Sequence, residues 1–231
     1  MDMYEALYLG REDLRARRKT RMYPIVKRGA EVILAIVLLI AISPLLLALA
    51  VLIVLDSPGS VFFRQIRIGK DGKPFKFYKF RSMYTNIDRS GHEAFLKAFV
   101  NGHAGEGAEA NEHQDFKPIK VNQVTGIGRL LRKTSMDELP QVFNIIKGDM
   151  SFIGPRPNVP AEVGEYKDWH KRRLGVLPGI TGLAQINGRS KISFDQIVRY
   201  DLEYVENESL VLDLQVLWRT VPAVLKARGA R

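Results

Sequence analysis

The longest apolar run in the chain extends from residue 32 to residue 55 and contains no charged residue and one hydroxyl group. A helix needs about 20 apolar residues to cross the hydrocarbon core of a bilayer, so this run is long enough to enter a membrane. A cleaved signal peptide is the competing interpretation. Its apolar part is shorter, however, and the residues that precede this run, 1–31, are mostly polar. The pattern therefore indicates a membrane-embedded segment.

Ser43 and Pro44 lie near the middle of this run. Proline lacks a backbone donor and clashes with the carbonyl one turn earlier, so the helix is expected to kink or break there. After a break, each half is too short to span a membrane. The hydroxyl of Ser43 can then donate a hydrogen bond to a carbonyl that the break leaves without a partner.

Basic residues flank the apolar run on both sides. They are Arg11, Arg15, Arg17, Arg18, Lys19, Arg21, Lys27 and Arg28 before it, and Arg64, Arg67, Lys70, Lys73, Lys76, Lys79 and Arg81 after it. Short basic flanks prefer the cytoplasmic side of a membrane. A re-entrant helix-break-helix over residues 25–57 keeps both flanks on that side. The alternative is a proline-kinked spanning helix, which would separate them.

Two segments after the membrane run, 61–68 and 74–80, alternate in polarity and are rich in β-branched and aromatic residues. The connection at 69–72 begins and ends with glycine, so a β-hairpin is predicted. Lys79 and Arg81 lie at the end of the second strand, among aromatic residues. Either such cations extend toward lipid headgroups, or they bind the phosphate of a substrate.

The remainder of the chain is predicted to be mainly helical. Helical spacing of apolar residues predicts helices over 125–132, 138–146, 160–174, 193–205 and 210–226, and a short one over 94–100 within an irregular stretch, 85–122. That stretch contains His92, His103 and His113, whose spacing fits no recognised metal-ligand pattern. The last helix carries an apolar face with Trp218, which we expect to rest on the membrane interface.

These patterns predict an α+β, mainly helical fold. We expect a monotopic membrane protein with an interfacial N-terminal segment (1–24), a re-entrant helical hairpin (25–57) and a compact cytosolic domain (58–231) that carries the small β-hairpin. The net charge is +10, but the basic residues concentrate beside the apolar run. Anionic lipids are therefore a simpler partner than nucleic acid. The absence of cysteine excludes disulfides and thiolate metal sites.

Two adjacent carboxylates, Asp137 and Glu138, precede an apolar helical pattern. One interpretation is a capping box, with Ser135 as the cap and Glu138 three residues later. Pro140 weakens that register, because it would lie past the first turn. In the other interpretation the helix starts at Glu138 and Asp137 is the cap, so that both carboxylates lie at a helix N-terminus. Such an ionised pair beside many cations could hold a divalent ion.

Two further segments have the composition of ligand-binding loops. Pro155 and Pro157 fix the backbone around Arg156, whose guanidinium suits forked recognition of a phosphate; a plain surface turn is the alternative. Residues 178–189 are rich in glycine and have polar tips, although they lack the strand and helix context of a phosphate-binding loop.

Five motifs follow one another along the chain. They are the apolar hairpin with Ser43-Pro44, Tyr78-Lys79-Phe80-Arg81, Ser135-Met136-Asp137-Glu138-Leu139-Pro140-Gln141, Gly154-Pro155-Arg156-Pro157, and Pro178-Gly179-Ile180-Thr181-Gly182 with Asn187-Gly188-Arg189. In this order they resemble the bacterial sugar transferase family of monotopic polyprenyl-phosphate phosphoglycosyl transferases, over about residues 27–224. The stretch 85–122 looks longer than in minimal members, and Leu183 stands where many relatives have tryptophan. These departures leave the sugar specificity open.

The resemblance implies a reaction in which a nucleotide diphosphate sugar, usually a UDP-sugar, gives its phosphosugar to polyprenyl (undecaprenyl) phosphate and releases UMP. It implies that Asp137 is the nucleophile of a covalent phosphosugar intermediate, with Mg²⁺ bound at Asp137 and Glu138 and with Glu138 assisting. A carboxylate that approaches an anionic diphosphate needs the charge neutralised, and a metal ion and fixed cations supply this. The expected substrate-binding residues are Lys79, Arg81, Arg156, Gln185, Asn187 and Arg189.

The resemblance also implies partners and a location. The expected partners are a nucleotide sugar, polyprenyl phosphate and anionic membrane lipids, with no nucleic acid; a homodimer is left open. The expected location is the bacterial cytoplasmic (inner) membrane, with the active site on its cytoplasmic face. There the enzyme would catalyse the first membrane step of a surface glycan, such as an exopolysaccharide, an O-antigen or a capsule.

Two other functions are kept beside this one. A non-catalytic membrane protein would use its basic surface to bind anionic lipid or nucleic acid, with Asp137 and Glu138 serving as a helix cap. A magnesium-dependent hydrolase of diphosphates would use water in place of the lipid acceptor. Release of UMP, and its dependence on polyprenyl phosphate, separates the three.

Overall fold

The computed structural model describes residues 22–85, 90–102, 123–188 and 192–225. The predictions for the N-terminal segment 1–21, for His103 and His113, and for Arg189 lie outside these residues.

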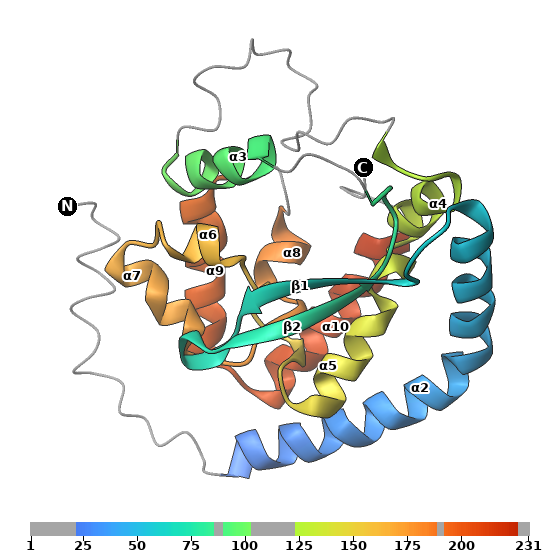
Figure 1. The fold of residues 1–231 in the computed structure, drawn as a ribbon. Coiled ribbons are helices and arrows are strands. Elements are labelled where there is room, and N and C mark those ends of the chain that lie inside the picture. Colours follow the sequence, from blue (N-terminus) through green and yellow to red (C-terminus); the bar gives the residue numbers. More distant parts are fainter. Residues whose placement is uncertain (1–21, 86–89, 103–122, 189–191, 226–231) are drawn as a thin grey trace.

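The described residues form a mainly helical α+β domain, which confirms the predicted class (Figure 1). In chain order the elements are α2 (Met22–Asp56), β1 (Phe62–Ile68), η1 (Lys70–Gly72), β2 (Pro74–Phe80), α3 (Ser90–Val100), α4 (Gly126–Thr134), η3 (Met136–Gln141), α5 (Val142–Lys147), β3 (Ser151–Ile153), α6 (Pro160–Val163), α7 (Asp168–Lys171), η4 (Arg172–Gly175), β4 (Gly179–Thr181), α8 (Leu183–Asn187), α9 (Phe194–Asn207) and α10 (Leu210–Leu225). Figure 1 shows α2 following the lower and right-hand edge of the domain, with the β1–β2 hairpin across its centre.

Helix α2 contains the apolar run. Within the described part of the chain it is the one helix that is long and apolar enough to cross a membrane, and little of its apolar window is buried against the protein. The Ser43 hydroxyl donates a hydrogen bond to the Ile40 carbonyl at 2.8 Å. That carbonyl lies four residues before Pro44, which has no N–H to offer it. As predicted, Ser43 supplies the missing donor.

The predicted break between two separate helices is wrong. Helix α2 is continuous through Pro44, and in Figure 1 it bends between its blue and teal parts rather than ending and restarting. Because the Ser43 hydroxyl satisfies the freed carbonyl, the backbone has no need to leave the helix at the proline. The kink that the sequence also allowed is what the structure contains.

Both ends of α2 pack on the same domain. Near its start, Arg28 donates to the carbonyl of Ile145 at 2.6 Å. At its end, the Asp56 carboxylate accepts a hydrogen bond from the Ile127 amide at 2.9 Å, at the first turn of α4. The bend therefore brings the two flanks of the apolar run back to one body.

The predicted β-hairpin is confirmed. Strands β1 and β2 are antiparallel, with Phe62 opposite Phe80 and Ile68 opposite Pro74. Phe75 and Phe77 point from one face of β2 into a core cluster that includes residues of α5. Since side chains alternate along a strand, this face also carries Lys79, at the end that approaches η3.

A second sheet was not predicted. Strand β3 runs parallel to β4, with Ser151 opposite Gly179. A Cβ added at Gly179 would lie 2.1 Å from the Gly154 amide nitrogen, so no larger residue fits at the crossing. The first half of the predicted ligand loop, 178–189, is therefore a core strand that requires glycine for close backbone approach.

The single amphipathic helix predicted over 160–174 is wrong, because this segment divides into α6, α7 and η4. Glu162 accepts a hydrogen bond from the Val159 amide at 2.8 Å, and His170 accepts one from the Lys167 amide at 3.2 Å. The first bond caps the N-terminus of α6 and the second caps the N-terminus of α7. These side-chain bonds to the backbone compete with a continuous helix.

The helices predicted for the remaining segments are confirmed as α3, α4, α9 and α10. Ser193 caps the N-terminus of α9, since its hydroxyl accepts a hydrogen bond from the Gln196 amide. The outer side of α10 is apolar and exposed, and Trp218 on it is 81% exposed. Its contact with a membrane interface stays a prediction.

Candidate active site

Asp137 and Glu138 lie in the first turn of η3, which continues directly into α5. Ser135 ends α4 in the left-handed conformation, with φ of 58°, so the chain turns sharply just before the carboxylates. The Glu138 amide donates to the Ser135 carbonyl at 3.2 Å and thereby starts the tight 3₁₀ turn. The prediction that both carboxylates lie at a helix N-terminus is confirmed.

Neither predicted cap is formed in detail. Ser135 makes no side-chain capping bond, so the capping-box interpretation is wrong. The helix begins at Met136 rather than at Glu138, so Asp137 is inside the first turn and is not the cap. The left-handed conformation of Ser135 allows η3 to start at Met136, because the turn out of α4 already directs the chain into η3.

Lys79 joins the two carboxylates to strand β2. Its Nζ donates to Glu138 Oε1 at 2.8 Å and to Asp137 Oδ2 at 3.3 Å. The same ammonium lies 5.8 Å from the centre of the Phe77 ring, a cation–π distance. Of the two roles predicted for Lys79, its place beside the carboxylates fits phosphate binding better than contact with lipid headgroups.

Arg156 reaches Glu138 from the loop after β3. Its Nη2 donates to Glu138 Oε1 at 2.7 Å and its Nη1 to Glu138 Oε2 at 3.4 Å, which is a forked pair. The Arg156 side chain is 42% exposed, whereas the Glu138 side chain is 20% exposed. Four of the predicted site residues therefore form one cluster, the carboxylate quartet: Lys79, Asp137, Glu138 and Arg156.

The charges of the quartet fix the ionisation of Glu138. Burial opposes its ionisation, but the charges of Arg156 and Lys79 and their hydrogen bonds hold the pKa of Glu138 well below its usual range. The Glu138 charge in turn raises the pKa of Arg156. Two carboxylates and two cations have a formal charge of zero, so the quartet would repel an anionic ligand less than the two carboxylates alone.

The other predicted substrate contacts lie elsewhere in the fold. Arg81 is buried, and its guanidinium donates to the carbonyls of Ser57 and Pro58, the latter at 2.9 Å, at the end of α2. Gln185 and Asn187 belong to α8, which packs against α9 and α10. Their contacts with substrate stay predictions.

The carboxylate pair fits a simple type of magnesium site. Within the described ranges, no group of three or more His, Cys, Asp or Glu side chains could hold a metal ion. Magnesium, however, commonly binds one or two carboxylates together with water and substrate phosphates. Asp137 and Glu138 are a donor set of that kind, so the metal would depend on the diphosphate for its other ligands.

Asn144 supports the quartet and was missed by sequence reasoning. It is fully buried in α5, where its amide nitrogen donates to the Lys76 carbonyl at 2.7 Å and its Oδ1 accepts from the Tyr78 amide at 3.1 Å. These bonds fix β2 against α5 just before Lys79. The available signal was a polar residue between apolar Phe143 and Ile145, where a buried helix face was expected.

Comparisons with known proteins find relatives along most of the chain. A family model described as Bacterial sugar transferase matches residues 22–227. Exopolysaccharide production protein ExoY of Sinorhizobium fredii is 42% identical over 206 residues, which cover 89% of this chain and 88% of that protein. The undecaprenyl-phosphate galactose phosphotransferase of Salmonella typhimurium is 37% identical over 227 residues, covering 98% of this chain and 45% of that longer protein.

A third relative carries a different sugar in its name. The UDP-N-acetylgalactosamine-undecaprenyl-phosphate N-acetylgalactosaminephosphotransferase of Aeromonas hydrophila is 37% identical over 216 residues, which cover 91% of this chain and 46% of that protein. The family match extends over α2, the carboxylate pair and the Arg156 loop. It confirms the resemblance seen in the five motifs and does not support the interpretation as a non-catalytic membrane protein. The chain is a transferase enzyme and belongs to the bacterial sugar transferase family.

Proposed function

We propose that this enzyme transfers a phosphosugar from a UDP-sugar to undecaprenyl phosphate, releasing UMP and forming an undecaprenyl diphosphate-linked sugar. The observation that carries the proposal is the carboxylate quartet, in which two carboxylates are balanced by two cations from different elements. Two relatives are named as undecaprenyl-phosphate phosphotransferases, and one name includes the UDP-sugar donor. The chain covers less than half of both, so their activity enters here as a proposal.

Asp137 is the nucleophile in this proposal. One of its carboxylate oxygens attacks the β-phosphorus of the UDP-sugar, and the P–O bond to the α-phosphate breaks, so that UMP leaves with the bonding electrons. An oxygen of undecaprenyl phosphate then attacks the same phosphorus and returns the carboxylate of Asp137. Two displacements let a water-soluble donor and a lipid acceptor use one site in turn.

The other members of the quartet manage charge. Glu138 stays ionised and keeps Lys79 and Arg156 beside Asp137. The partly exposed Arg156 can turn from Glu138 to the diphosphate, where its planar fork matches phosphate oxygens. Mg²⁺ bound at Asp137 and Glu138 would act as a Lewis acid on the diphosphate.

The apolar helix supports a location of this chemistry at a membrane. A straight helix of 35 residues would be about 50 Å long. Instead α2 bends, and both its ends contact the domain that carries the quartet. We propose that α2 is re-entrant in the bacterial cytoplasmic membrane, with both flanks and the catalytic domain (58–231) on the cytoplasmic face. The exposed apolar side of α10 would add a second contact with the interface.

The test is release of UMP by the purified protein in detergent or nanodiscs, with Mg²⁺, undecaprenyl phosphate and a panel of UDP-sugars. The proposal expects UMP with at least one donor, a lipid-linked phosphosugar, and neither product with Asp137→Asn. Steady UMP release without acceptor would favour the diphosphate hydrolase. No UMP from any donor would contradict the proposed function and leave the donor nucleotide to be sought among other bases.

A further inference from the structure

The loop that carries Arg156 is held by its carbonyl groups, one after another. The Pro155 carbonyl accepts from the Gly179 amide at 2.9 Å, and the Asn158 carbonyl accepts from the Ile68 amide at 2.9 Å. The two carbonyls between them accept hydrogen bonds from guanidinium groups instead of backbone amides. Arg173 Nη2 donates to the Arg156 carbonyl at 3.0 Å, and Arg67 Nη1 donates to the Pro157 carbonyl at 3.0 Å.

The sequence of the loop explains why its carbonyls are used. Pro155 and Pro157 have no backbone N–H, so at these positions the chain can be fixed only through accepted hydrogen bonds. Buried carbonyls without partners would be costly, and the strands on either side supply amides only to the outer two. The two side chains therefore complete a set of four bonds across four consecutive residues.

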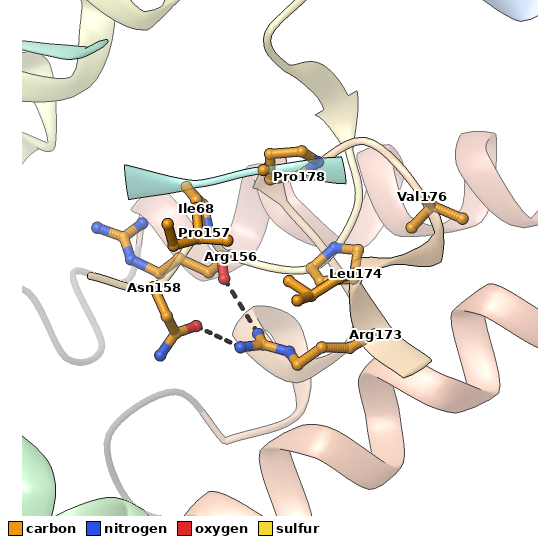
Figure 2. Close-up of a pocket in the computed structure, with 10 residues that line it drawn as sticks. Ile68, Arg156, Pro157, Asn158, Arg173, Leu174, Val176 and Pro178 are labelled. Carbon is orange, nitrogen blue, oxygen red and sulfur yellow. Dashed lines mark hydrogen bonds between the residues drawn. The ribbon is translucent and has the colours of Figure 1, made fainter. Parts of the chain in front are cut away.

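Arg173 is built into the protein beneath the loop. It is 2% exposed, and its Nε donates to Asp201 Oδ2 at 2.8 Å while its Nη1 donates to the Tyr166 hydroxyl at 2.5 Å and to Asn158 Oδ1. Figure 2 shows its guanidinium under the loop, bonded to the Arg156 carbonyl, while the Arg156 side chain extends away from it. Arg173 thus bonds to the backbone carbonyl of Arg156, and the guanidinium of Arg156 remains available to the quartet.

Arg67 holds the other side of the same turn. It lies on β1, 3.9 Å from Glu162 Oε2 and 5.4 Å from the centre of the Phe77 ring. Burial, opposed by Glu162, lowers the pKa of Arg67 to about 10, so the guanidinium remains charged at neutral pH. A charged donor to the Pro157 carbonyl is stronger than a neutral one.

A direct role of Arg173 in substrate binding is less well supported. The cavity beside it is lined by Arg156, Pro157, Asn158 and Arg173 and has a volume of about 10 Å³. That is room for roughly one water molecule and not for a nucleotide or a sugar.

We propose that Arg67 and Arg173 are positioning residues for Arg156, which together fix its backbone so that its guanidinium is aimed at Glu138 and at the diphosphate. This inference rests on the proposed function for the role of Arg156 in the reaction. The geometric part, the clamp on the loop, stands on the four carbonyl bonds alone.

The test uses Arg67→Lys and Arg173→Lys. Each variant keeps a positive charge beside Glu162 or Asp201 but loses the planar guanidinium that bonds to the loop carbonyl. The matched control is Arg172→Lys, which changes a neighbouring arginine whose partner is Glu206 at 3.5 Å. We expect about a tenfold loss of kcat/KM for UMP release in each of the first two variants and little change in the control. On an Arg156→Ala background, each added lysine variant should change the rate less than about twofold.

A merely structural role predicts a different result. The losses would then multiply on the Arg156→Ala background, and this outcome would overturn the positioning role. Hydrogen–deuterium exchange of the peptide that spans residues 154–159 supplies a readout independent of activity. It should rise in Arg67→Lys and Arg173→Lys and not in Arg172→Lys; unchanged exchange in the first two would overturn the clamp. If the wild type releases no UMP while exchange rises as expected, the proposed function fails and the clamp survives.

Discussion

Arg156 and Glu138 form a forked ion pair, with Nη2 2.7 Å from Oε1 and Nη1 3.4 Å from Oε2. The pair joins the loop after β3 to the first turn of η3, two elements that are close in sequence but are brought together only by the fold. Because Lys79 also contacts Glu138, this one carboxylate organises both cations of the candidate site. In the proposed function, Asp137 therefore meets the diphosphate in a site where the compensating cations are already in position.

Replacing Lys79 by methionine should reduce kcat/KM for UMP release by roughly 10- to 1,000-fold, because one preorganised cation is lost where phosphate charge must be stabilised. Lys76→Met is the matched control, since Lys76 is exposed on the opposite face of the same strand. Steady-state assays of the two variants measure the difference. Equal effects would show that Lys79 acts only through general surface charge.

Glu138 should contribute acid-sensitive stability. Its pKa is below the usual range in the folded protein, because Arg156 and Lys79 outweigh the effect of burial. Its contribution is therefore fully present above the unfolded pKa of about 4.3 and is lost as the pH falls through the lower folded value. Thermal unfolding between pH 7 and pH 3 should show a steeper loss below about pH 4.3 in the wild type than in Glu138→Gln. Parallel curves would mean that the ion pairs with Glu138 do not stabilise the fold.

Gly179→Ala should destabilise the domain by at least about 2 kcal/mol, because the new methyl group would lie 2.1 Å from the Gly154 nitrogen and would separate β3 from β4. Gly175→Ala is the control, since no heavy atom lies within 4 Å of the added Cβ. It should change stability by less than about 0.5 kcal/mol. Chemical denaturation of both variants tests the glycine requirement, and similar midpoints would contradict it.

The two ends of α2 should share one side of the membrane. Since the chain has no cysteine, Ala6→Cys and Lys70→Cys each provide a single label site. In intact cells both should resist a membrane-impermeant thiol reagent, and both should react after permeabilisation. Pro44→Leu should expose one of them, because it restores the backbone donor and straightens the helix. Pro222→Leu, which alters a proline within α10, is the control. Labelling of only one wild-type site in intact cells would exclude the re-entrant arrangement.

Helix α10 should touch lipid through Trp218. The two tryptophans differ sharply, since Trp218 is 81% exposed and Trp169 is 8% exposed. Brominated lipids in nanodiscs should quench fluorescence in the wild type and in Trp169→Phe, but not in Trp218→Phe. Quenching that survives Trp218→Phe would place the lipid contact elsewhere.

Local patterns in the sequence were sufficient to predict the β-hairpin, most of the helices and the side-chain hydrogen bond that compensates for the missing donor at Pro44. Alternation identified β1 and β2. The Ser43 hydroxyl was predicted to satisfy a freed carbonyl, and the structure shows that this carbonyl belongs to Ile40. The carboxylates and Arg156 were also identified, because they carry charge in stiff or helix-initiating segments. Their grouping with Lys79 followed from the resemblance to a family and is present in the structure.

Features that depend on contacts distant in sequence were missed. Strands β3 and β4 have three residues each and pair across 25 intervening residues, too short a pattern for alternation to reveal. The segment 160–174 has the periodicity of one helix, but capping by Glu162 and His170 divides it. Nothing near Arg173 in the sequence indicates that it is buried or that its partner is Asp201 on α9.

The most direct test of the account is intact-protein mass spectrometry of enzyme mixed with its UDP-sugar and Mg²⁺ and quenched before undecaprenyl phosphate is added. We expect a mass increase equal to one phosphosugar, located on Asp137 after digestion, absent in Asp137→Asn, and removed from the wild type when the acceptor is supplied. A wild-type enzyme that turns over with both substrates but never carries this mass, or that carries it on another residue, would contradict Asp137 as the nucleophile.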